Sequence, residues 1–204
     1  MYPTLFNTIE QSINKVFISE ERKELLQPLI YYIQGKVTSK EPVQLNFICT
    51  HNSRRSHLAQ IWAEVAINYF SIPSIMCYSG GTEETALYPT IILVLKEQGF
   101  IIDIISSGAN PIYVIKYQDN YRSIIGFSKR FDSPFNPKSD YVAVMTCSQA
   151  DEGCPYIAGA NLRLPIMYED PKISDGTEEQ MKVYRDRSLE IGAEMFYVMS
   201  QIKK

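Results

Sequence analysis

The chain has 204 residues, of which 45% are hydrophobic and 21% are charged, and these values are typical of one globular domain with a sizeable core. The formal net charge of −3 offers no basic surface to a phosphate backbone, which argues against a nucleic-acid-binding protein. The longest aliphatic run, residues 91–95, is too short for a membrane span, and charged residues interrupt the first twenty positions. Four cysteines are too few for a disulfide scaffold, which favours a reducing compartment. Together with the short aliphatic runs, this predicts a cytoplasmic protein without membrane contact.

The first forty residues predict two helices. Apolar residues recur at helical spacing over the first seventeen positions. A second helix is expected to begin after Ser19, a favourable N-cap residue, and to end at Gly35. We interpret residues 1–40 as an N-terminal helical extension of a domain formed by residues 41–204. The extension would serve as a stabilising lid or as the contact of a homodimer.

From residue 43 onward, predicted strands alternate with predicted helices. The strands cover residues 43–48, 75–79, 141–146 and 162–165, and the helices cover residues 56–70, 84–98 and 177–203. This alternation predicts a three-layer α/β fold, in which helices cover both faces of a four-stranded parallel sheet. Thr177 and Gln180 suggest a capping box at the last helix. The turn signal Asp119-Asn120 separates two apolar segments, which predicts a β-hairpin insertion at about residues 110–131.

The segment from Cys49 to Ser56 joins a buried strand to a helix and contains mostly small or polar residues. In such a loop, backbone amides and the helix N-terminus converge and stabilise an anion, including the thiolate of a cysteine that faces them. Arg55 can grip two oxygens of a tetrahedral oxyanion, and Ser56 can donate its hydroxyl to the sulfur of Cys49. The residues expected to bind the oxyanion are Thr50, His51, Asn52, Ser53, Arg54, Arg55 and Ser56. The bland alternative is a structural cysteine near an unrelated arginine.

This loop resembles the phosphate-binding loop of low-molecular-weight protein tyrosine phosphatases and thioredoxin-coupled arsenate reductases. The resemblance continues at Ala59, Trp62 and residues 78–81, 139–147 and 169–171, and it covers about residues 43–105 and 138–204. It implies the phosphotyrosine phosphatase I-like fold. It also implies that Cys49 is the nucleophile, that Arg55 binds the oxyanion and that Asp170 is the general acid. Without the resemblance, Asp170-Pro171 is only a turn signal.

Two further cysteines, Cys147 and Cys154, distinguish the branches of this family. Cys147 ends a predicted strand, so in a parallel sheet of this topology it would lie near Cys49. The three cysteines resemble those of the arsenate reductases, which implies a disulfide relay from Cys49 through Cys147 to Cys154 and a thioredoxin-like reductant. The alternatives are two inert buried cysteines, or zinc ligands together with His51 and His57. We expect no metal and no cofactor.

The spacing of Cys147 and Cys154 gives a separate expectation. If the residues between them are helical, the two Cα atoms lie about 10.5 Å apart, whereas a disulfide requires less than about 7 Å. The segment must therefore unwind before the two thiols can be oxidised to a disulfide. Gly153 and Pro155 are suitable neighbours for a segment that leaves a helix easily.

Three positions depart from the family pattern. His51 stands where glycine is common, Arg54 stands where arsenate reductases often have cysteine, and Gln60 replaces a common glutamate, which puts a bound alkali cation in doubt. Residues 172–176, after the Asp-Pro pair, lack the aromatic side chains usual in the phosphatases. We therefore expect reduction of arsenate to arsenite. The alternatives are hydrolysis of phosphate monoesters through a phosphocysteine and a non-catalytic module that binds an oxyanion or a partner protein.

Overall fold

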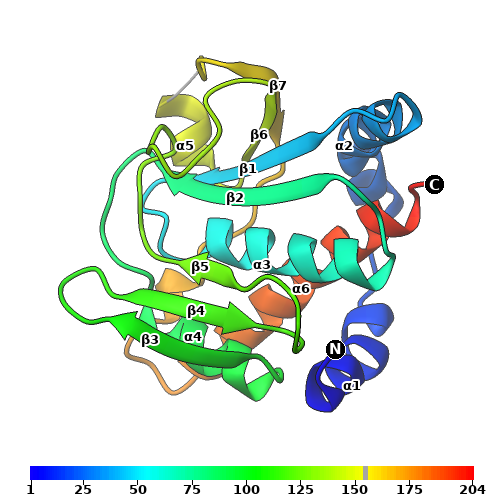
Figure 1. Cartoon of the computed structure of the whole chain (residues 1–204). Coiled ribbons are helices and arrows are strands. Elements are labelled where there is room, and N and C mark those ends of the chain that lie inside the picture. The colour runs from blue at the N-terminus through cyan, green and yellow to red at the C-terminus, as the bar shows by residue number, and fades with distance from the viewer. Residues whose placement is uncertain (154–155) are drawn as a thin grey trace.

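The computed structural model describes residues 1–153 and 156–204, and it contains a four-stranded parallel sheet, in the upper half of Figure 1. The strands are β1 (Val43–Cys49), β2 (Ile75–Gly81), β6 (Tyr141–Met145) and β7 (Ala160–Pro165), in the order β2-β1-β6-β7. β1 pairs with both β2 and β6, so its carboxyl end lies in the middle of the sheet. The predicted parallel sheet is confirmed.

The two faces of this sheet bury different side chains. The helices are α1 (Pro3–Gln11), α2 (Glu20–Thr38), α3 (Arg55–Tyr69), α4 (Pro89–Glu97), α5 (Ser148–Gly153) and α6 (Gln180–Ser200). Phe47 and Val144 belong to the large core that includes α3 and α6, whereas Ala143 and Met145 belong to a smaller cluster with Ala150 of α5. Because successive side chains of a strand point to opposite faces, helices cover both faces of the sheet, as predicted.

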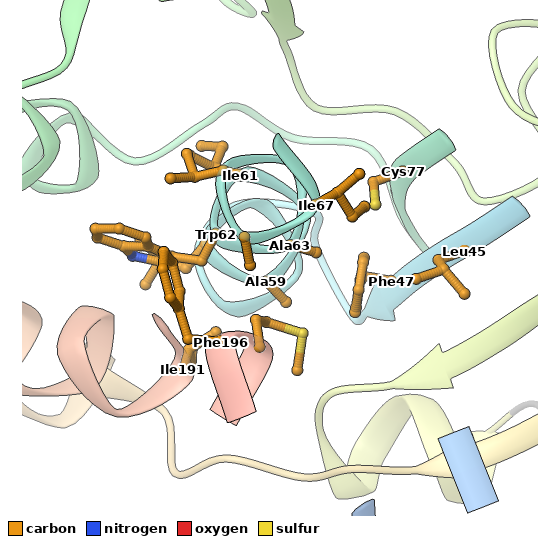
Figure 2. Close-up of a cluster of buried hydrophobic side chains, with 14 of the residues drawn as sticks. Leu45, Phe47, Ala59, Ile61, Trp62, Ala63, Ile67, Cys77, Ile191 and Phe196 are labelled. Atoms are coloured by element: carbon orange, nitrogen blue, oxygen red, sulfur yellow. The ribbon is translucent and has the colours of Figure 1, made fainter. Parts of the chain in front are cut away.

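Helix α3 runs through the middle of the larger core. In Figure 2, Phe47 of β1 lies on one side of α3, and Ile191 and Phe196 of α6 lie on another. Trp62 is fully buried there, and its indole N–H donates to the Ser188 hydroxyl over 2.9 Å. Since α3 is buried along nearly all of its length, the position of its N-terminus is fixed by packing.

A second, antiparallel sheet lies beside α4 in Figure 1 and has the order β3-β4-β5. Its strands are β3 (Ile101–Ser106), β4 (Ile112–Lys116) and β5 (Ile124–Gly126). β4 and β5 form the predicted hairpin, and Asn120 in their connection has a positive φ of 54°, which asparagine tolerates. The sequence did not reveal β3 as a third strand, because its residues do not alternate between apolar and polar.

The N-terminal segment forms two helices as predicted, with different ends. The first helix stops at Gln11 and a 3₁₀ turn (Ile13–Lys15) follows, so Phe17 lies outside it and is 87% exposed. Ser19 caps α2 by accepting from the Arg22 amide at 3.2 Å. α2 continues past Gly35 to Thr38, since an exposed glycine lowers helix stability only modestly and does not force a stop.

Two other expectations at helix ends require correction. α4 begins at Pro89 rather than at residue 84, because proline favours the first position of a helix. The capping box of the last helix does not form: Thr177 donates its hydroxyl to Ser174 O, and Gln180 accepts from the Gly176 amide. In the part of the chain that the structure describes, no helix is both long enough and apolar enough to span a membrane.

Candidate functional site

The loop between β1 and α3 starts from a buried cysteine. Cys49 is the last residue of β1, is 4% exposed, and has its Sγ 3.1 Å from the Ser56 Oγ. Helix α3 begins at Arg55, so its N-terminal amides face the same region. A thiolate at this position would have the hydroxyl of Ser56 and the positive end of a helix beside it.

The carbonyl groups of the loop are bonded from outside. Thr82 N donates to Cys49 O, Glu83 N to Thr50 O, the Ser128 hydroxyl to His51 O and Tyr88 N to Ser53 O, over 2.8–3.1 Å. Within residues 1–153 and 156–204, the amides of residues 50–54 donate to no other protein group. Outward carbonyls leave the loop amides free to converge on a bound anion, which is the arrangement of an anion-binding nest.

Asn52 holds the centre of this loop. It is fully buried and has a positive φ of 44°, a conformation that asparagine adopts more readily than most residues. Its amide group donates to the Ser56 Oγ at 2.9 Å and accepts from the Lys129 N at 3.0 Å. The absence of a side chain at Gly81 lets the loop pack closely, since a Cβ there would lie 2.6 Å from Thr50 O.

Arg55 and Asp170, which are 115 positions apart in sequence, meet at the site. The Arg55 Nη2 lies 2.5 Å from the Asp170 Oδ2, and its Nη1 donates to Tyr168 O at 3.0 Å. The Arg55 Nε is buried and has no partner among the described residues. Asp170 also accepts from the Lys172 amide and thereby caps a 3₁₀ turn (Pro171–Ser174). The geometry therefore places a cation and a carboxylate together beside the loop.

The neighbouring Arg54 points elsewhere. Its Nε donates to the Tyr184 hydroxyl at 2.6 Å, and its Nη2 lies 2.6 Å from the Asp175 Oδ2. Its guanidinium carbon stacks 3.9 Å above the centre of the Tyr88 ring. These contacts occupy the side chain that the sequence assigned to the oxyanion, so Arg54 faces the loop only through its backbone amide.

The other residues expected at the oxyanion lie around the loop. The imidazole of His51 is half-exposed and lies 3.4 Å from a Glu83 carboxylate oxygen. Ser53 is buried, and its backbone carbonyl accepts from the Tyr88 amide. Gln60, which the sequence singled out only as a departure from the family pattern, lies one turn along α3 and donates to Cys77 O at 3.1 Å. Among residues 1–153 and 156–204, no group of three or more histidine, cysteine or acidic side chains is arranged to hold a metal ion.

Cys147 lies beside the loop, as its position after β6 predicts. The side chain is buried, and its Sγ is 3.4 Å from the Thr50 Oγ1. Cys49 and Cys147 belong to the same buried cluster. A pocket of about 440 Å³ opens at Cys147; its lining is Arg55, Cys147, Ser148, Gln149, Met167, Tyr168, Glu169 and Asp170. The third cysteine of the expected relay, Cys154, lies outside the described residues.

Two buried ionisable groups, Lys129 and His57, lie beside residues of the loop; the sequence offered His57 only as an alternative zinc ligand and did not single out Lys129. Lys129 is 3% exposed, and burial lowers its pKa to about 8. Its ammonium lies over the rings of Phe127 and Phe135, at 4.5 and 5.5 Å. Burial, and then the charge of Lys129, lowers the pKa of His57 well below its ordinary value. Lys129 lies in the hairpin region outside the resemblance, so no sequence pattern linked it to the loop.

Known proteins that are similar to this chain in sequence or in structure carry two related names, arsenate reductase and low-molecular-weight protein tyrosine phosphatase. No protein-family model matches the chain. Arsenate reductase 2 of Staphylococcus epidermidis is 30% identical over 125 residues, which are 61% of this chain and 76% of that protein. The arsenate reductase of Halalkalibacterium halodurans is 28% identical over 147 residues, 72% of this chain and 87% of that protein. The low-molecular-weight protein tyrosine phosphatase of T. tengcongensis shares the fold with a TM-score of 0.52, 14% identity and coverage of 78% and 99% of the two chains.

Proposed function

The chain belongs to the family of arsenate reductases and low-molecular-weight protein tyrosine phosphatases, and on this basis we propose that it reduces arsenate to arsenite. The observation that carries the proposal is the second thiol beside the anion loop. The Sγ of Cys147 is one hydroxyl contact from the loop, at 3.4 Å from the Thr50 Oγ1, and it shares a buried cluster with Cys49. Hydrolysis of a phosphate ester needs no second thiol, whereas reduction of arsenic needs one to accept the oxidising equivalents.

Binding of arsenate is the first step. The amides of the loop and the guanidinium of Arg55 supply donors for its oxygens. In the structure Arg55 is paired with Asp170, so the arriving anion competes with this carboxylate for the guanidinium. The Arg55 Nε provides a further donor that no described residue uses. Arsenate would thus replace the Asp170 carboxylate as the anion bound to Arg55.

The Cys49 thiolate then attacks arsenic. A sulfur–arsenic bond forms and an arsenic–oxygen bond breaks; the departing oxygen receives a proton from Asp170 and leaves as water. Arsenic is still pentavalent in this adduct. Ser56, whose Oγ lies 3.1 Å from the sulfur, stabilises the thiolate before the attack.

Reduction follows when the Cys147 thiolate attacks the Cys49 sulfur. A disulfide forms, the sulfur–arsenic bond breaks, and its electron pair stays on arsenic, which leaves as trivalent arsenite after taking up a proton. The thiolate of Cys154 then attacks Cys147, which frees Cys49 and creates the Cys147–Cys154 disulfide. A dithiol reductant of the thioredoxin class supplies two electrons and two protons to restore both thiols.

A phosphatase is the second candidate, favoured by the same arrangement of Cys49, Arg55 and Asp170. In that reaction Cys49 would take a phosphoryl group from a phosphate monoester, and water would then release phosphate from the phosphocysteine. Cys147 and Cys154 would have no role in turnover.

For the domain organisation, we propose that residues 1–40 extend the catalytic domain of residues 41–204. Leu5, Ile9 and Leu29 are fully buried in the same core as α3, which supports a stabilising role for the extension. A homodimer through these helices stays a prediction, which sedimentation analysis of the full chain would check.

Paired assays test the proposed function. Arsenate reduction coupled to thioredoxin, and hydrolysis of an aryl phosphate, are measured on the wild type and three variants. Cys49→Ser should lose both activities, because no covalent adduct can form. Cys147→Ser should lose arsenate turnover and keep aryl phosphate hydrolysis. Cys77→Ala, which removes a buried thiol on β2, should keep both.

The wild type decides between the two chemistries, and the Cys147→Ser variant tests the relay. If the wild type hydrolyses the aryl phosphate but does not reduce arsenate, the reductase proposal is wrong and the phosphatase takes its place. If Cys147→Ser reduces arsenate at the wild-type rate, the relay through Cys147 is wrong. Mass spectrometry of the wild type during arsenate turnover should detect the Cys147–Cys154 disulfide, and thiols that stay reduced would equally contradict the relay.

A further inference from the structure

The segment that carries Asp170 leaves the sheet after β7. Its backbone is tied to the sheet only as far as Tyr168, through bonds from Ile166 N to Met145 O and from Tyr168 N to Thr146 O, over 3.0 and 3.2 Å. Asp170 lies two residues beyond the last of these bonds. Arg55 and the Lys172 amide bind its carboxyl group directly. The position of the Asp170 backbone depends in addition on what holds residues 167 and 168.

Arg22, in the first turn of α2, reaches this segment from the N-terminal extension. Its Nη2 donates to Met167 O at 3.0 Å, and its guanidinium carbon lies 4.9 Å from the centre of the Tyr168 ring. The same guanidinium binds Glu194 of α6 with both forks, at 2.6 Å from Nε and 3.0 Å from Nη2. One side chain thus joins the extension, α6 and the segment before Asp170.

The contacts continue to the anion-binding arginine. The Tyr168 hydroxyl donates to the Glu194 Oε2 at 2.7 Å, and the carbonyl of Tyr168 accepts from the Arg55 Nη1 at 3.0 Å. Burial, and then the charge of Glu194, raises the pKa of Tyr168 well above its ordinary value, so its hydroxyl stays a donor. Tyr168 therefore links the two groups: its hydroxyl donates to Glu194, the partner of Arg22, and its carbonyl accepts from Arg55.

Burial makes this network sensitive to the loss of Arg22. The Glu194 side chain is 4% exposed. Removing the cation that pairs with a buried carboxylate strongly destabilises the folded state, because an uncompensated charge stays buried. Glu190, on the same helix, is a second acidic group close by, and its own cation is Arg187. Without Arg22, the Tyr168 hydroxyl would be the one remaining hydrogen-bond donor to Glu194 among the described residues, and the segment would have to move or admit water.

We propose that Arg22 is a positioning residue for the general acid: it fixes the segment from Met167 to Asp170 so that the carboxyl group meets the departing oxygen. The inference rests on the proposed function in taking Asp170 as the acid, and it gives the N-terminal extension a role in the reaction. Arg22 touches neither the oxyanion loop nor Cys49, so its effect is indirect, through Tyr168 and Glu194.

The main test uses two aryl phosphates whose leaving groups differ in acidity. p-Nitrophenolate leaves readily, whereas phenolate needs the proton of the general acid. In Arg22→Met, kcat/KM for phenyl phosphate should fall roughly tenfold to a hundredfold, the size expected for a misplaced catalytic group. The fall for p-nitrophenyl phosphate should be several times smaller. Arg22→Lys, which keeps the charge, should recover part of the loss.

A matched control separates positioning from general destabilisation. Arg122 also pairs with a buried carboxylate, Glu64, with Nη2 at 2.7 Å from Oε2, and it lies away from the acid segment. Arg122→Met should lower the melting temperature without changing the ratio of kcat/KM between the two substrates. If Arg22→Met also leaves this ratio unchanged, Arg22 has only a structural role and the proposal is overturned.

Hydrogen exchange gives a test that does not depend on activity. Amides of residues 167–174 should exchange faster in Arg22→Met than in the wild type, and Arg122→Met should leave them unchanged. Equal exchange in both variants would contradict the proposal. A wild type that neither reduces arsenate nor hydrolyses either ester would overturn the proposed function alone, and the exchange result would still decide whether Arg22 holds the segment.

Discussion

The two strand ends that meet at the site are built in opposite ways. After β1, every structural feature fixes the loop: its carbonyls are bonded from residues 82–88 and 128, and Asn52 is pinned on both sides. After β6, Cys147 leads into the six-residue helix α5, in which Ala150 alone is buried. Anion binding requires donors that are already in place, whereas a disulfide relay requires a segment that can leave its helix. If the proposed relay operates, one site needs both a rigid loop and a helix that can unwind.

Substitution of Arg55 should have the largest effect on the rigid side. Arg55→Lys keeps the charge and loses the two-pronged grip, so kcat/KM for arsenate and for aryl phosphate should fall roughly a hundredfold to a thousandfold. Arg54→Lys is the matched control, because its side chain contacts Tyr184 and Asp175 instead of the loop. Steady-state kinetics of both variants checks this, and equal losses would show that the two arginines do not differ in role.

The loop itself is tested by Asn52→Gly. Glycine accepts the φ of 44° without strain, so the change removes only the side-chain bonds to Ser56 and to the Lys129 amide. We expect a loss of about 2 kcal/mol in the free energy of unfolding and a fall in kcat/KM of roughly tenfold. Denaturant unfolding and kinetics measure the two quantities. A variant with wild-type kcat/KM would show that catalysis does not depend on the side-chain hydrogen bonds of Asn52.

Lys129 adds a pH dependence to the rigid side. Its pKa of about 8 in the folded protein lies below the ordinary value of 10.5, so between these values the unfolded chain binds more protons and stability rises with pH. Below pH 8 the folded protein carries the full cost of the buried charge. Lys129→Met should therefore gain on the order of 3 kcal/mol in stability relative to wild type at pH 7, and the gain should fall through this range and disappear above about pH 10.5. Unfolding curves at several pH values measure it; a gap independent of pH would contradict the assignment.

The parts of the site that the sequence predicted are those with a local signal. Cys49, Arg55 and Ser56 lie in one strand–loop–helix segment, and the structure places the sulfur and the Ser56 hydroxyl in contact. Cys147 was placed by topology, because the ends of neighbouring parallel strands meet at one edge of the sheet. The four-stranded sheet and the hairpin followed from the spacing of apolar runs and turn residues.

The parts that the sequence missed depend on distant contacts. Arg22 and Glu194 are 172 positions apart, and the bond between Lys129 and Asn52 spans 77 positions, so neither leaves a periodic pattern. The direction of Arg54 depends on Tyr184 and Asp175, which come together only in the folded chain. Two helix ends were wrong for local reasons: the exposed Gly35 does not force α2 to stop, and Pro89 begins α4 later than expected.

Whether α5 unwinds during the relay is tested by the smallest change. Gly153 ends α5 in open space, with no atom within 4 Å of a Cβ built there, so Gly153→Ala introduces no clash. Alanine favours the helix by about 0.5–1 kcal/mol over glycine. If α5 must unwind before the Cys147 and Cys154 sulfurs can meet, formation of their disulfide should slow by up to about fivefold.

The matched control for this change is Gly35→Ala. Gly35 is also in a helix with no atom within 4 Å of its built Cβ, but it lies in α2, remote from the relay. Quenched-flow mass spectrometry of a single arsenate turnover gives the rate of disulfide transfer, and aryl phosphate hydrolysis should be unchanged in both variants. Only Gly153→Ala should slow the transfer, because only there does added helix stability oppose the movement of Cys147 toward its partner. Equal transfer rates in the two variants would show that α5 stays folded during the relay, and the contrast between the rigid and the unstable strand end would then be wrong.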